Sequence, residues 1–138
     1  MSEHLRAMRL LPVLGTAAMI AVGGLIGGGP LPVAARVPGQ SAQVVQGEQV
    51  YARACQSCHG ANLEGTVGPP LDAARLTAYG TAARLYQYVR GTMPMDAPGS
   101  LSEQEYYDVI AYLLQRNGLL PPETTLDAST AADIALRP

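Results

Sequence analysis

The feature that most constrains this chain is a run of five residues, Cys55-Gln56-Ser57-Cys58-His59. Two thiols at this spacing lie about one helical turn apart, so each can form a thioether bond with one of two neighbouring vinyl groups. The histidine that follows brings an imidazole to the same group as an iron ligand. The pattern is typical of c-type haem attachment, and it predicts one haem c held covalently by Cys55 and Cys58 and ligated by His59.

Two other kinds of site use paired cysteines, a redox-active dithiol of the thioredoxin type and half of a zinc site. Neither accounts for His59. A zinc site needs further Cys or His ligands, but the chain holds only two Cys and one other histidine, His4, which lies in the N-terminal leader. We therefore favour the haem interpretation over both alternatives.

The N-terminal part of the sequence is typical of an export signal. A short polar start with two arginines precedes an uncharged stretch over residues 10–35. Its first part, residues 10–26, is long for a signal peptide and at the lower limit for a membrane span. Small residues before Arg36 suit signal peptidase, so we favour a cleaved signal peptide over residues 1–35, with an uncleaved membrane anchor as the alternative. Either outcome predicts a periplasmic domain, which contacts the membrane only if the segment is kept.

The composition beyond the leader limits the kinds of partner that the domain can bind and indicates which group fills its core. From residue 36 onward there are seven Arg and ten acidic residues, a net charge of −3, so we expect no nucleic-acid partner. This part contains neither Phe nor Trp. A buried haem would therefore be its largest apolar group, and we expect the domain to fold poorly without it.

Three segments follow the leader. Pro, Gly and Ser residues predict a flexible linker over residues 36–43, and helical periodicity then marks a domain over residues 44–120. A tail over residues 121–138 remains. It either wraps the domain, docks on a partner or is disordered, and its only apolar anchors are Leu126, Ile134 and Leu136.

The first two helices of the domain are predicted from apolar spacing. One helix spans about residues 44–54 and delivers the haem motif at its end, with an inner face of Val44, Gly47, Tyr51 and Cys55. A second spans about residues 81–90 and is expected to stop at Gly91. Its predicted inner side is Leu85, Tyr88 and Val89.

The last helix carries the strongest signal. Ser102-Glu103-Gln104-Glu105 is a capping box, and an apolar ladder follows and ends at Asn117-Gly118. The ladder consists of Tyr106, Val109, Ile110, Leu113 and Leu114. Since no segment alternates as a strand does, the predicted fold class is all-α.

Haem iron has two axial positions, and His59 accounts for one. No other histidine lies beyond the leader, so a second imidazole is excluded unless a partner supplies it. Only Met93 and Met95 offer sulfur there, a soft ligand suited to haem iron. We favour Met93, because Pro94 follows it and restricts the backbone that presents it, and Met95 is the alternative. Methionines more often pack in cores, but these two lie in a Gly/Pro-rich loop over residues 92–99.

At this point the sequence resembles the class I c-type cytochromes. The resemblance covers residues 44–120 and implies three main helices plus loops wrapped around one covalently bound haem. It also implies that the first and last helices cross, and that the Pro69 carbonyl accepts a hydrogen bond from the His59 imidazole. It rests on four motifs, Gly47-x-x-x-Tyr51, Cys55-x-x-Cys58-His59, Gly68-Pro69-x-Leu71, and Met93-Pro94 ahead of Asp108-Val109-Ile110-Ala111-Tyr112-Leu113.

A narrower part of the sequence is similar to the cytochrome subunits of bacterial sulfite and sulfane dehydrogenases. Related stretches occur in cytochrome partners of other periplasmic dehydrogenases and oxidases. The similarity therefore implies a type of cytochrome subunit but does not identify a substrate. It rests on Met93-Pro94-Met95-Asp96-Ala97-Pro98-Gly99-Ser100-Leu101, Asn117-Gly118-Leu119-Leu120 and Leu126-Asp127-Ala128.

Together these features predict periplasmic one-electron transfer by a monohaem cytochrome with His/Met ligation. We expect a carrier or an electron-transfer subunit for a dehydrogenase or oxidase, with redox proteins as donor and acceptor and no catalysis by the chain itself. The docking face should surround the Cys58 side of the haem. The alternative is a haem enzyme or gas sensor with an open sixth iron position, against which the missing distal histidine weighs.

Overall fold

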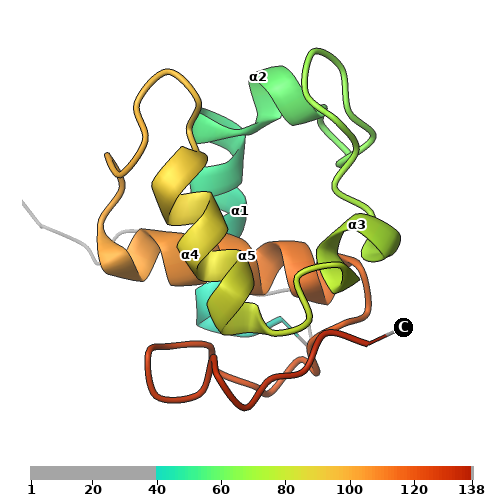
Figure 1. The fold of residues 1–138 in the computed structure, drawn as a ribbon, viewed down its shortest axis with the longest axis vertical. Helices are drawn as coiled ribbons and strands as arrows, with labels where there is room; N and C mark the ends of the chain where they lie inside the picture. Colours follow the sequence, from blue (N-terminus) through green and yellow to red (C-terminus); the bar gives the residue numbers. More distant parts are fainter. Residues whose placement is uncertain (1–39, 138) are drawn as a thin grey trace, which may run out of the picture. The chain divides into compact units, whose positions relative to one another are not determined.

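The computed structural model describes residues 40–137, and within this range the fold is all-α, as predicted (Figure 1). Its helices are α1 (Ala42–Ala54), α2 (Gln56–His59), α3 (Ala73–Thr77), α4 (Ala82–Thr92) and α5 (Glu103–Arg116). No helix in this range is long and apolar enough to cross a membrane. The predicted leader and the linker up to residue 39 lie outside the described residues.

Helix α1 begins two residues earlier than predicted, because Ser41 caps it. The Ser41 hydroxyl accepts a hydrogen bond from the Val44 amide at 3.3 Å. The predicted inner face is buried at Val44, Gly47 and Tyr51, and Val50 is buried with them. The helix ends at Ala54, so it delivers the cysteines as expected.

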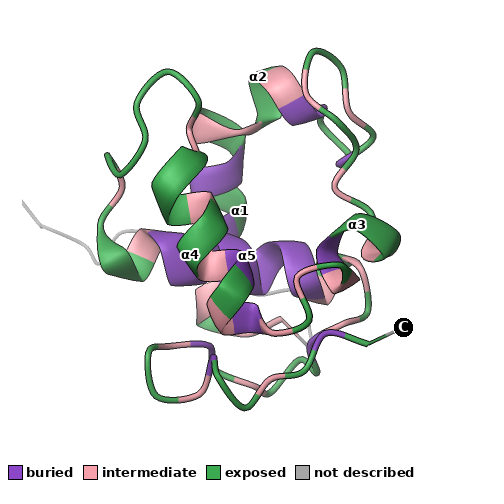
Figure 2. Cartoon of the chain, viewed as in Figure 1, coloured by how far each residue is buried: buried purple, intermediate pink, exposed green. Residues whose placement is uncertain are grey.

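Helix α5 forms the centre of the core. It begins with the predicted capping box, in which the Ser102 hydroxyl and the Glu105 carboxylate each bind the other residue's backbone amide. Every residue of the predicted ladder is buried, and the helix ends at Asn117 as expected. Figure 2 shows that buried residues are concentrated along this helix.

Helices α1 and α5 cross at Gly47, as the resemblance implies. A Cβ atom at Gly47 would overlap the carbonyl oxygen of Asp108, so only glycine permits this approach. Beside the crossing, the rings of Tyr51 and Tyr112 pack with their centroids 5.4 Å apart. The crossing fixes the end of α1, which leads directly into the haem motif.

Helix α4 differs from the prediction in two respects. It continues through Gly91 to Thr92, since glycine in a helix costs only about 1 kcal/mol and no steric barrier stops it there. Leu85 is buried, but Tyr88 is 45% exposed and packs beside Tyr79 at the edge of the core, with ring centroids 5.0 Å apart. The inner face passes instead through Ala82, Leu85 and the partly buried Val89.

Helix α3 has no counterpart among the helices predicted from the sequence. The Asp72 carboxylate caps it by accepting a hydrogen bond from the Arg75 amide at 2.9 Å. Leu76 is its buried residue and joins the common core. Five residues are too few to show a helical period, which is why the pattern missed it.

The tail wraps the domain, which was one of the three predicted outcomes. The side-chain amide of Gln43 binds the backbone of Leu126 twice, as donor at 2.7 Å and as acceptor at 2.8 Å. The amides of Ala82 and Ala83 donate to tail carbonyls at 3.0 Å, so the tail caps the start of α4. Leu126 and Leu136 are buried and Ile134 is partly buried, as expected of the anchors, and Ala131 is buried with them.

Candidate haem-binding site

The residues of the haem motif lie on one short turn. Cys55 leaves the helical conformation at the end of α1, with φ −127° and ψ −36°, and the single turn of α2 follows. The carbonyl of Cys55 accepts hydrogen bonds from the amides of Cys58 at 3.1 Å and His59 at 3.0 Å. Local hydrogen bonding therefore places Cys55, Cys58 and His59 side by side, and in Figure 1 the turn lies at one end of the fold.

His59 is buried, with 8% of its surface exposed. Its Nδ1 atom lies 2.8 Å from the carbonyl oxygen of Pro69, which can only accept a hydrogen bond. Nδ1 therefore carries the proton and donates it, which leaves the lone pair of Nε2 free for a metal. The hydrogen bond that the family resemblance implies is thus present.

The loop over residues 60–71 is bound tightly to this turn. The carbonyl of Cys58 accepts three hydrogen bonds, from the Thr66 amide at 3.1 Å, the Thr66 hydroxyl at 2.8 Å and the Gly68 amide at 2.8 Å. The carbonyl of His59 accepts one more from Gly65 at 2.8 Å. These bonds satisfy the carbonyls at the end of α2 and fix the path of the loop.

Gly68 lets the same loop pass against the imidazole. A Cβ atom at this position would lie 2.9 Å from Cε1 and 3.0 Å from Nδ1 of His59. Such contacts are tighter than normal packing, so a side chain would push the ring away from Pro69. The loop therefore packs against the imidazole ring and also accepts the hydrogen bond of its Nδ1 proton through Pro69.

Both cysteines are unpaired and partly buried. Burial raises the pKa of Cys55 to about 11, against a smaller opposing effect of the Arg53 charge. The Cys55 thiol is therefore neutral at pH 7, unlike the low-pKa thiol of a thioredoxin-type dithiol. Among residues 40–137, no group of three or more His, Cys, Asp or Glu side chains could hold a metal ion, so the zinc alternative gains no ligands.

The structure distinguishes the two candidate methionines. Met93 is partly buried at the C-terminal end of α4, where its amide donates to the Val89 carbonyl at 2.8 Å. Its own carbonyl accepts a hydrogen bond from the Tyr106 hydroxyl at 2.9 Å. Met95 is 73% exposed. Met93 is thus the methionine that the fold holds in place, on a loop separate from the one that carries Pro69.

Sequence reasoning missed two residues that shape this site. Thr66 binds the Cys58 carbonyl, and Tyr106 binds the Met93 carbonyl. Tyr106 was recognised only as an apolar position of the last helix. Its burial was predictable from the period of the ladder, but no sequence signal indicates where its hydroxyl points.

The donor set fits haem c. The site offers two unpaired thiols, a buried imidazole whose Nε2 is free, and a thioether on a residue held by two helices. The loop against the imidazole leaves no space for a side chain at Gly68, which suits a ring that must be fixed in one orientation.

Comparison with known proteins agrees with this fit. Residues 42–113 match the family described as cytochrome C oxidase, cbb3-type, subunit III. Two thiosulfate dehydrogenases are similar to the chain. The one from Allochromatium vinosum is 32% identical over 60% of this chain and 35% of that protein, and the one from Thiomonas intermedia is 34% identical over 55% and 27%. The chain thus spans about a third of the length of these curated relatives.

A solved structure shows the same fold. The crystal structure of the sulfane dehydrogenase SoxCD from Paracoccus pantotrophus aligns with a TM-score of 0.58 and 28% identity, over 67% of this chain and 52% of that one. The family match covers more than half of the sequence and includes the whole of the haem motif. The chain therefore belongs to this cytochrome c family, whose haem-containing domains take part in electron transport as parts of oxidoreductases.

Proposed function

We propose that this protein is a periplasmic monohaem electron carrier, or an electron-transfer subunit of a dehydrogenase or oxidase. The observation that carries the proposal is the hydrogen bond between His59 Nδ1 and the Pro69 carbonyl at 2.8 Å. It fixes the tautomer in which Nε2 can bind iron, directly beside two thiols at the spacing of haem attachment.

Four side chains would hold the cofactor. Cys55 and Cys58 would form thioether bonds, and His59 Nε2 and the sulfur of Met93 would be the axial ligands. When bound, haem c supplies an iron that takes up and gives back one electron at a time. His59 is buried, and the loop over residues 60–71 is hydrogen-bonded to the turn that carries it.

Ligation by both His59 and Met93 favours electron transfer over chemistry on a small molecule. With both axial positions filled by the protein, oxygen or peroxide has no position at which to bind. The alternative of an enzyme or sensor requires Met93 to be absent from the iron. The two backbone hydrogen bonds of Met93, to Val89 and from Tyr106, fix its backbone at the end of α4, as a ligand supplied by the protein requires.

The partner is proposed from the relatives. Their names are thiosulfate dehydrogenase and sulfane dehydrogenase, so a dehydrogenase that acts on a sulfur compound is a reasonable electron donor. Substrate oxidation would then take place on the partner, and this chain would accept single electrons from it. The net charge of −3 beyond the leader favours a basic docking surface on the partner.

Absorption spectra test the ligation. The protein is produced in cells that assemble c-type cytochromes, and its oxidised form should show the sulfur-to-iron charge-transfer band. Met93→Ala should abolish this band, whereas Met95→Ala, the matched control, should keep it. The reverse pattern would reassign the ligand to Met95. Rapid binding of carbon monoxide to the reduced wild-type protein would instead support an open sixth position.

Mass spectrometry tests attachment and export separately. The polypeptide should carry the mass of one haem, and replacing both Cys55 and Cys58 by Ala should remove it. We expect the mature chain in the periplasmic fraction to begin at Arg36. An intact leader on a haem-loaded chain would show that residues 1–35 act as an anchor, and a haem-loaded chain in the cytoplasm would contradict the proposed location.

A further inference from the structure

The Tyr106 hydroxyl is one of two groups that hold the backbone of Met93. The side chain of Tyr106 is fully buried, with 0% of its surface exposed, yet its hydroxyl reaches the Met93 carbonyl at 2.9 Å. The Met93 amide is held from the other side by the Val89 carbonyl of α4 at 2.8 Å. Met93 is therefore bound by α4 through its amide and by α5 through its carbonyl.

The ring of Tyr106 is fixed by aromatic neighbours. Tyr86 of α4 meets it edge to face, with centroids 6.2 Å apart and the planes at 88°. Tyr86 in turn stacks on Tyr107 of α5, with centroids 4.3 Å apart and the planes at 7°. Both arrangements are favourable aromatic geometries, so these contacts favour the observed orientation of the Tyr106 ring. Its hydroxyl is thereby aimed at Met93.

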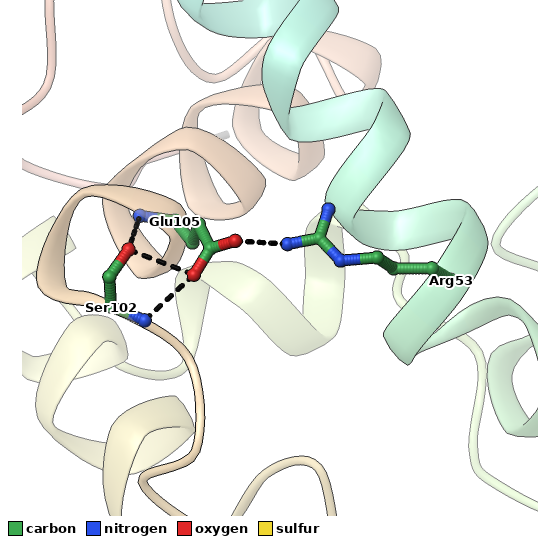
Figure 3. A network of polar contacts seen from close by, with 3 residues as sticks. All are labelled: Arg53, Ser102 and Glu105. Atoms are coloured by element: carbon green, nitrogen blue, oxygen red, sulfur yellow. Dashed lines mark hydrogen bonds and ion pairs between the residues drawn. The ribbon is translucent and has the colours of Figure 1, made fainter.

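The first turn of α5 is fixed as well. Figure 3 shows the Glu105 carboxylate bound to the Ser102 amide and hydroxyl and paired with Arg53 of α1. The two bonds to Ser102 are each 2.8 Å long. Tyr106 follows Glu105 directly, so this network anchors the backbone from which the tyrosine extends. The position of the hydroxyl thus depends on α1, α4 and α5 together.

We infer that Tyr106 is a positioning residue for the axial sulfur ligand, and that its hydroxyl keeps Met93 on the iron. The inference rests on the proposed ligation by Met93. Without the hydroxyl, the partly buried Met93 carbonyl loses its partner, and the loop gains freedom to move away from α5. The fraction of molecules in which the sulfur has left the iron should then rise.

Exogenous imidazole measures that fraction. Imidazole can bind the oxidised iron only after the sulfur has left, so its apparent affinity is proportional to the population without the sulfur–iron bond. Loss of the hydrogen bond to this partly buried carbonyl should increase this population about tenfold. We therefore expect Tyr106→Phe to bind imidazole about tenfold more tightly than the wild type, measured by loss of the charge-transfer band.

Tyr107→Phe is the matched control. Tyr107 is a buried tyrosine at the next position of α5, and within the described residues its hydroxyl has no hydrogen bond. Imidazole affinity in this variant should stay within about twofold of the wild type, since phenylalanine keeps the ring that stacks on Tyr86 and no hydrogen bond to Met93 is lost. Equal changes in the two variants would overturn the inference, because they would reflect general packing.

The remaining outcomes separate this inference from the proposed function. A wild type that shows the band, together with an unchanged imidazole affinity in Tyr106→Phe, would overturn the role of Tyr106 and leave Met93 as the ligand. A wild type without the band would overturn the ligation itself. If Tyr106→Phe assembles poorly, Tyr86→Leu can replace it, because it loosens the Tyr106 ring and keeps the hydroxyl. The imidazole affinity of Tyr86→Leu should rise, but by less than about tenfold. An unchanged affinity would count against the inference.

Discussion

The two loops that would supply the axial ligands are held in different ways. On the histidine side, the loop over residues 60–71 returns four hydrogen bonds to the carbonyls of Cys58 and His59, and a fifth joins His59 to Pro69. On the methionine side, within residues 40–137, only Met93 makes hydrogen bonds to other elements, through Val89 and Tyr106. Residues 95–100, which follow it, are exposed.

Each loop is also tied to a long helix by one buried tyrosine. The Tyr51 hydroxyl of α1 donates to the carbonyl of Gly60 at 2.6 Å, directly after His59, and the Tyr106 hydroxyl of α5 donates to that of Met93 at 2.9 Å. Five further hydrogen bonds hold the histidine side, whereas within the described residues the bond from Met93 to Val89 is the other one that holds Met93. Ligand exchange at the iron should therefore begin at Met93.

The largest expected effect comes from filling the space at Gly68. Gly68→Ala would place a Cβ atom 2.9 Å from the His59 ring and 3.2 Å from the Cys58 carbonyl, both of which are held firmly. We expect a loss of roughly 3 kcal/mol in the free energy of unfolding, because the tight loop has no room to relax. Urea denaturation of the haem-loaded protein measures it.

Gly91→Ala is the counterpart on the methionine side and should have the opposite sign. Gly91 lies in the last turn of α4, and within the described residues nothing lies within 4 Å of a Cβ atom built there. Alanine should therefore stabilise the helix by roughly 0.5 kcal/mol. A destabilised Gly91→Ala variant, or a neutral Gly68→Ala variant, would contradict the difference between the two sides.

The second effect compares the two tyrosines. Tyr51→Phe leaves the buried carbonyl of Gly60 without its partner, so we expect the free energy of unfolding to fall by roughly 2 kcal/mol. The charge-transfer band and the imidazole affinity should nevertheless stay unchanged, because the other bonds of the loop keep His59 in place. A weakened band in this variant would show that the histidine side is no better held than the methionine side.

This contrast also explains what could be predicted from the sequence. The haem motif and α5 were predictable because both depend on neighbours along the chain. Cys55 binds residues three and four positions on, and the Ser102 capping box starts a ladder with a clear period. The hydrogen bond from His59 to Pro69 came only from the family resemblance.

What could not be predicted depends on contacts between distant elements. The bond from Tyr106 to Met93 joins a loop to a helix, and the Gln43 side chain pairs with Leu126 across 83 positions in the sequence. The prediction that Gly91 stops α4 was wrong because glycine only weakens a helix, and here the helix continues to Thr92. Local patterns carry no information on the two long-range bonds, whereas the error at Gly91 came from giving a local signal too much weight.

The smallest expected effect concerns two carboxylates, one on each side. Hydrogen bonds from its own amide and from that of Asn62 lower the pKa of Glu64 on the histidine side. Bonds from the Ser102 amide and hydroxyl, with the Arg53 charge, lower the pKa of Glu105 at the start of α5. A lowered pKa in the folded state stabilises the fold above the unfolded pKa of about 4.3, and this stabilisation is lost as the pH falls through the folded value.

Salt separates the two carboxylates. Backbone amides hold Glu64, whereas Glu105 also attracts the exposed charge of Arg53, which salt screens. The free energy of unfolding is measured for wild type, Glu64→Gln and Glu105→Gln between about pH 3 and 7. It should fall less steeply with decreasing pH in both variants than in the wild type. High salt should reduce the difference from wild type only for Glu105→Gln, in which glutamine can still complete the capping box. An equal effect of salt on Glu64→Gln would show that the ion pair between Arg53 and Glu105 does not distinguish the two carboxylates.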